Sequence, residues 1–111
     1  TIKMLLYGIS TNEKRIEKGF DLTFEFLIDL WNTQNGKCAI TGIEMTYLKG
    51  KGIFYPSNIV IDRIDSSKGY LKSNVQLLCS WANVAKGALD MEEFKNMISI
   101  THKNLIKENN G

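Results

Sequence analysis

The sequence predicts a small α+β domain with a strand, loop, strand and helix in its middle. Residues 58–65 carry a β-branched run that favours a strand. A turn-rich stretch leads to a second short apolar strand at 75–78, and residues 80–87 follow as a short helix closed by a glycine. The chain has 111 residues, of which 43% are hydrophobic, which suits one small core. We therefore treat 1–111 as a single domain.

Two helices are expected before this unit, in a helical lead-in over 1–36. Residues 2–18 show a weak amphipathic pattern. Residues 24–31 place apolar side chains on one helical face, after an Asp-Leu-Thr sequence that offers an N-cap. Asn35-Gly36 is a typical helix end.

A further helix is expected after the unit, over 90–107. Asp90 and Glu93 form a capping-box pattern at its start, and apolar residues recur along one face. Residues 46–58 are rich in Gly, Lys and Tyr and hold the one proline, so we expect a loop there.

Charge and hydropathy give only broad limits on function. The 14 Lys and Arg against 12 Asp and Glu leave a formal charge of +2, which does not predict a strong field for nucleic acid. The acids gather near the two ends, so the middle of the chain is mildly basic, and phosphate contacts are local. There is no apolar run of membrane-spanning length and no signal-peptide pattern. We expect a cytoplasmic protein without a membrane partner.

Three segments, in order, carry a resemblance to a known family. They read NGKCAITG at 35–42, IDRIDSSKGY at 61–70 and NVQLLC at 74–79, and the last runs on through Asn83 to Lys86. Each is weak alone, but the ordered set is similar to the phage-type HNH endonuclease family. The resemblance implies a ββα-metal (His-Me finger) core over 37–88.

The resemblance implies a hydrolase that cleaves DNA with Mg²⁺ or Mn²⁺. It assigns Asp62 and Asn83 as metal ligands, and Asn74 as the residue that holds the loop. Cleavage builds negative charge on the phosphate and the leaving oxygen, which a hard cation stabilises. Magnesium accepts few protein ligands and keeps waters, so one carboxylate and one amide oxygen are a plausible anchor. A phage or bacterial host cell is the expected setting.

The sequence departs from the family at Arg63, where the family has its general-base histidine. An arginine stays protonated and cannot serve as a base. His102, the one histidine of the chain, falls on the expected C-terminal helix and is interpreted as solvated. Three alternatives stay open: Asp65 activates the water as a carboxylate; Arg63 binds the scissile phosphate while the metal or the substrate activates the water; or the domain binds DNA without cutting it.

Other basic residues are candidates for DNA contacts. Lys68 and Lys72 flank the loop, and Lys86 lies one helical turn beyond Asn83 and could contact a phosphate. Arg63 could instead pair with a neighbouring acid, Asp62 or Asp65. The aromatic residues Trp31, Tyr70 and Trp81 are interpreted as core.

Many relatives carry two Cys-x-x-Cys knuckles that hold zinc. Here each knuckle has lost one cysteine, so Cys38 and Cys79 remain. Two thiolates are too few for a structural zinc site, which normally takes four ligands. We expect no structural zinc, and two buried free thiols lying close together.

Three functions therefore remain in competition. The leading one is a nicking or double-strand DNA endonuclease, and the second is a catalytically silent DNA-binding module of the same fold. The third is a protein-interaction domain, which the near-neutral charge keeps open. A homodimer or a larger parent protein also stays open.

Overall fold

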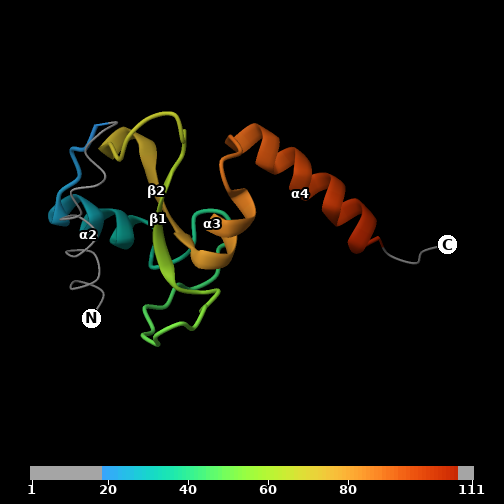
Figure 1. The fold of residues 1–111 in the computed structure, drawn as a ribbon, viewed down its shortest axis with the longest axis horizontal. Helices are drawn as coiled ribbons and strands as arrows, with labels where there is room; N and C mark the ends of the chain where they lie inside the picture. Colours follow the sequence, from blue (N-terminus) through green and yellow to red (C-terminus); the bar gives the residue numbers. More distant parts are fainter. Residues whose placement is uncertain (1–18, 108–111) are drawn as a thin grey trace.

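The computed structural model describes residues 19–107 and shows a small α+β domain (Figure 1). Its elements are α2 (Phe24–Thr33), β1 (Ile59–Arg63), the 3-10 turn η2 (Lys72–Asn74), β2 (Val75–Cys79), α3 (Ser80–Lys86) and α4 (Met91–Leu105). The predicted order of strand, loop, strand and helix is confirmed. The helix predicted over 2–18 lies outside the described residues.

The two strands form an antiparallel pair that continues directly into α3. The register runs from Ile59 opposite Cys79 to Arg63 opposite Val75. Both strands are buried at their first, third and fourth positions, as expected for short strands covered by other elements. Because α3 begins at the residue after β2, it folds back beside the strand pair.

The core lies between α2, the strand pair and α3. Leu27 of α2 and Leu77 of β2 have no exposed surface. The buried cluster comprises Leu22, Leu27, Cys38, Met45, Ile59, Ile61, Val75, Leu77, Leu78, Cys79 and Ala82. Burial of these side chains is the main favourable term for so small a domain.

Helix α2 begins and ends as its sequence predicts. The Thr23 hydroxyl accepts a hydrogen bond of 3.1 Å from the Phe26 N–H, which makes Thr23 the N-cap. Gly36 follows the helix with φ 68°, and a Cβ there would lie 2.9 Å from the Trp31 ring. Only glycine fits this position without strain, because both the backbone angle and the close approach exclude a side chain.

Helix α4 extends away from the rest of the domain (Figure 1). Its predicted capping box is present, with the Asp90 carboxylate accepting from Glu93 N–H and the Glu93 carboxylate accepting from Asp90 N–H. Phe94 is buried, whereas Met97 and Leu105 on the same apolar face are exposed. Within residues 19–107, the apolar face of α4 is thus covered only near the start of the helix.

The two cysteines are buried free thiols, as predicted. Thr41 contacts both: its N–H donates to Cys38 Sγ at 3.4 Å, and its hydroxyl lies 3.9 Å from Cys79 Sγ. Burial raises the pKa of Cys38, but hydrogen bonds from the Thr41 side chain and from the Thr41, Cys79 and Ile40 backbones outweigh it and lower the pKa overall.

The prediction that the aromatic residues are core is wrong for one of them. Trp31 and Tyr70 pack against the buried cluster, but Trp81 is 48% exposed. Trp81 is the second residue of α3, and the inward face of this short helix is taken by Ala82 and Lys86. Among the helices of residues 19–107, none is long and apolar enough to cross a membrane.

Candidate active site

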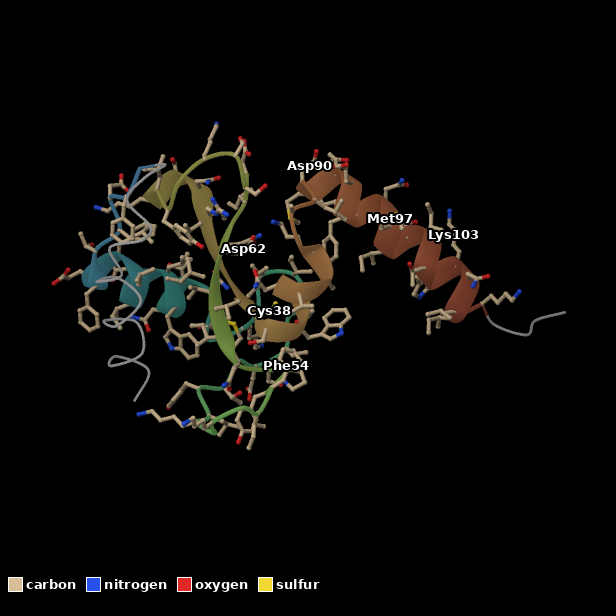
Figure 2. The ribbon with its side chains drawn as sticks, viewed as in Figure 1. Cys38, Phe54, Asp62, Asp90, Met97 and Lys103 are labelled. Carbon is tan, nitrogen blue, oxygen red and sulfur yellow. The ribbon has the colours of Figure 1, made fainter. Side chains whose placement is uncertain are left out.

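A polar pocket of about 190 Å³ opens where β1 ends beside α3. It is lined by Ile61, Asp62, Arg63, Ser66, Tyr70, Asn83 and Gly87. Three of the residues assigned from the motifs, Asp62, Arg63 and Asn83, therefore meet at one place. Figure 2 shows Asp62 on β1 on the side of α3.

Asp62 is held in the pocket wall by a buried ion pair. Lys86 Nζ lies 3.2 Å from Asp62 Oδ1, and the two side chains are 0% and 6% exposed. Lys86 Nζ also donates to the Arg63 carbonyl at 3.1 Å. Two acceptors at β1 thus satisfy an ammonium group that would be costly to bury alone.

The second Asp62 oxygen is held from the neighbouring strand. Gln76 pairs with Asp62 in the antiparallel register, and its Nε2 donates to Oδ2 at 3.0 Å. Sequence reasoning missed this residue. Pairing the predicted strands 58–65 and 75–78 could have placed Gln76 beside Asp62, because residues directly opposite in an antiparallel pair have their side chains on the same face.

Asn83 lies on the face of α3 that turns towards the pocket. It comes three residues before Lys86, so the two side chains share one face of the helix. Its side-chain amide makes no hydrogen bond to another residue of 19–107, although its carbonyl accepts the N–H of Gly87. The amide oxygen is thus available for a ligand in the pocket.

Arg63 lines the pocket without neutralising either nearby acid. Its Nη1 donates to the Lys68 carbonyl at 3.3 Å, and its guanidinium carbon lies 5.2 Å from the centre of the Tyr70 ring. The pairing with Asp62 or Asp65 that the sequence left open is not formed. The positive charge of Arg63 therefore remains available to an anion.

Asn74 holds the loop between the strands, as the motif implies. Its Oδ1 accepts from Asp65 N–H at 2.9 Å, while its Nδ2 donates to the carbonyls of Asp65 and Gly69 at 3.0 and 2.9 Å. The side chain is buried. Asn74 therefore has a structural part in the site and shapes the loop that carries Ser66 and Tyr70.

Asp65 lies outside the lining of the pocket. Its Oδ1 accepts from the Ser67 hydroxyl at 2.6 Å and from the Ser67 N–H at 2.9 Å. These two hydrogen bonds, side chain first, lower the pKa of Asp65, with a smaller effect from Lys68. Asp65 therefore stabilises the turn at residues 65–67.

The three lysines proposed for DNA contacts lie in different surroundings. Lys68 and Lys72 are exposed, and Lys72 Nζ lies 5.9 Å from the centre of the Phe26 ring. Lys86, in contrast, is fully buried against Asp62, so in this structure its ammonium does not reach a phosphate outside the domain. Lys86 is buried because it lies on the inner face of α3.

No protein-family model, curated protein or solved structure matches this chain. The functional interpretation therefore depends on its own residues: the ordered motifs and the pocket in which Asp62, Arg63 and Asn83 meet.

Proposed function

We propose that this chain is a divalent-metal-dependent DNA endonuclease of the ββα-metal class. The observation that carries the proposal is the meeting of Asp62, Arg63 and Asn83 in one polar pocket between a strand pair and the helix that follows it. Asp62 and Arg63 are neighbours at the end of β1, whereas Asn83 lies on α3, and the fold brings Asn83 to them. A carboxylate, an amide and a guanidinium form a set of groups suited to a phosphodiester and its counter-ion.

The oxygen atoms in the pocket fit a magnesium or manganese ion held by few protein ligands. Asp62 and Asn83 would supply a carboxylate and an amide oxygen, and a carboxylate oxygen can accept more than one bond. When bound, such an ion stabilises the charge that develops during phosphodiester hydrolysis. Lys86 competes for the same carboxylate, because its ammonium lies against Oδ1.

Arg63 is suited to binding the phosphate. The Lys68 carbonyl and the Tyr70 ring orient its guanidinium at the pocket, and a guanidinium presents several N–H donors to phosphate oxygens. Asp65 is poorly placed to take a proton in the pocket, since Ser67 holds its Oδ1 and it does not line the pocket. Activation of the water by the bound ion or by the substrate is therefore the stronger of the alternatives.

One observation favours a second function, a catalytically silent DNA-binding module. The carboxylate assigned to the metal is already paired with a buried lysine. If that ion pair persists in solution, Asp62 has a structural task, and Arg63 remains as an anion-binding group. The domain would then bind a phosphate without cleaving its ester.

The two functions are separated by incubating the protein with supercoiled plasmid in Mg²⁺ or Mn²⁺. We expect nicking that is lost in EDTA and in Asp62→Ala. Asp29→Ala, at an exposed acid of α2, is the matched control and should cleave like the natural chain. If the folded protein shifts plasmid in a gel-shift assay but cleaves it in neither Mg²⁺ nor Mn²⁺, the result would support the silent module and contradict the endonuclease.

A further inference from the structure

Residues 46–58 form a loop without helix or strand, and hydrogen bonds hold its two ends together. Thr46 and Asn58 pair in an isolated β-bridge, and the Asn58 side chain makes further hydrogen bonds to Thr46 and Leu48. Asn58 Oδ1 accepts from the Thr46 hydroxyl at 2.6 Å and from Leu48 N–H at 2.9 Å, and its Nδ2 donates to the Leu48 carbonyl at 2.8 Å. Compact loops with joined ends are often functional.

A tight turn at Gly50 gives the loop its shape. Ile53 N–H donates to the Gly50 carbonyl at 3.2 Å, and the Tyr55 hydroxyl donates to the Lys49 carbonyl at 3.4 Å. A Cβ at Gly50 would lie 2.6 Å from the Tyr55 hydroxyl, so a larger residue there would displace the end of the Tyr55 side chain. These hydrogen bonds favour one conformation of the loop, and such preorganisation reduces the entropic cost of binding.

This ordered loop exposes large apolar side chains to solvent. Phe54 is 57% exposed, and Tyr47, Leu48 and Ile53 are exposed to a similar degree. Single exposed apolar residues are common, but a group of them on one fixed loop indicates an interaction site.

Trp81 adjoins this loop at the start of α3. Its backbone N–H donates to the Pro56 carbonyl at 3.0 Å, and the neighbouring Ser80 hydroxyl donates to the Asn58 carbonyl at 3.0 Å. Figure 2 shows Phe54 on the loop that lies beneath α3 in this view. We call the exposed side chains of Tyr47, Leu48, Ile53, Phe54 and Trp81, with Lys49 and Lys51, the loop–Trp81 surface.

The charge of this surface has one sign. From 45 to 61 the chain carries Lys49 and Lys51 and no acidic residue. Exposed aromatic rings beside ammonium groups are the combination that binds single-stranded nucleic acid, because bases stack on the rings and phosphates meet the charges. Paired bases are less suited, since their faces are already stacked within the duplex.

We propose that the loop–Trp81 surface binds single-stranded DNA, with Trp81 and Phe54 stacking on unpaired bases and Lys49 and Lys51 contacting phosphates. The proposal rests on the proposed function only for the choice of DNA. The surface lies at the opposite end of β1 from Asp62 and Arg63, and five strand residues span about 13 Å. This surface would therefore contact DNA at nucleotides other than the one at the pocket.

The first test measures Trp81 fluorescence in the full chain with EDTA present, so that no cleavage is needed. The chain has two tryptophans, and Trp31→Phe leaves Trp81 as the reporter. We expect a short oligothymidylate to quench Trp81, and a duplex of the same length to quench it less. Circular dichroism of Trp31→Phe verifies the fold, since Trp31 packs against the core.

The second test measures the affinity of a labelled oligothymidylate by fluorescence anisotropy. Trp81→Ala and Phe54→Ala should each weaken binding about five-fold or more, as expected for loss of base stacking. Their matched control is Met97→Ala, at an apolar residue of α4 that is 50% exposed, and this variant should bind like the natural chain.

Salt dependence tests the two lysines. Changing both Lys49 and Lys51 to Gln should reduce the slope of log affinity against log salt by about 1.4, since each phosphate contact on a single strand contributes about 0.7. Lys103→Gln on α4 removes one exposed charge as the control and should leave the slope unchanged.

Unchanged affinity in both Trp81→Ala and Phe54→Ala overturns the proposal, as does equal binding of duplex and single strand without quenching. Absence of any oligonucleotide binding also overturns it and would leave a protein as the expected occupant. Oligonucleotide binding that depends on Trp81 and Phe54, by a chain that does not nick plasmid, supports this surface and contradicts only the endonuclease. Nicking without a contribution from Trp81 or Phe54 contradicts only this surface.

Discussion

Lys86 Nζ lies 3.2 Å from Asp62 Oδ1, inside the domain and beside the polar pocket at the end of β1. Gln76 holds the other carboxylate oxygen, so the acid that the motif assigns to a metal is held from α3 and from β2. Lys86, Gln76 and Asp62 therefore affect both the stability of the core and the availability of the proposed metal ligand.

Replacing Lys86 with Met should destabilise the domain by about 3 kcal/mol or more. Methionine fills similar space, but it leaves the buried Asp62 carboxylate without its counter-charge. Urea unfolding of the natural chain and the variant measures the loss. The double variant Asp62→Leu with Lys86→Met should recover much of it, because no charge is left unpaired. A loss below about 1 kcal/mol in the single variant would show that the pair behaves like an exposed one.

Replacing Lys86 with Gln should strengthen Mn²⁺ binding if Asp62 is a metal ligand. Glutamine keeps a donor for Asp62 and for the Arg63 carbonyl but removes the positive charge that opposes a cation. Isothermal titration with Mn²⁺ alone measures the affinity, with Lys95→Gln on the exposed face of α4 as the charge control. Equal affinity in both variants would indicate that Mn²⁺ does not bind at Asp62.

The fold was largely predictable because its signals are local. The β-branched run that became β1 and the capping box at Asp90 each act through neighbours in sequence, and the structure confirms both. The extent of core contact along α4 was not predictable. An apolar helical face shows that burial is favourable, but it does not show what covers the face, and here Met97 remains exposed.

The proximity of Asp62 and Asn83 was predictable from the motifs, but the contacts of Gln76 and Lys86 with Asp62 were not. Ordered motifs placed Asp62 and Asn83 in one pocket. The direction of the Lys86 side chain depends on the face of α3 that turns to β1, and a one-residue difference in a short helix changes that face. Trp81 was misplaced for the same reason, since residue type favours burial while the helix phase directs it outwards.

Asn74→Ala should destabilise the domain by about 2 kcal/mol. The change removes three hydrogen bonds and leaves groups of Asp65 and Gly69 without partners, Gly69 being buried. Thermal or urea unfolding measures the loss, and Asn96→Ala on the exposed surface of α4 is the matched control. A loss no greater than that of the control would mean that water replaces all three bonds.

Ser67→Ala should raise the pKa of Asp65 towards its ordinary value near 3.8, because the largest cause of the lowered pKa is the hydrogen bond from the Ser67 hydroxyl. A carboxyl whose pKa is depressed by folding adds stability above its unfolded pKa, and this stability is lost as the pH falls through the folded pKa. The natural chain should therefore be more stable than Ser67→Ala near neutral pH, with the difference shrinking below about pH 4. NMR titration of the Asp65 carboxyl and urea unfolding across this range measure both effects, with Ser99→Ala on α4 as the control. A titration of Asp65 that Ser67→Ala leaves unmoved would show that the Ser67 hydroxyl does not hold the carboxylate.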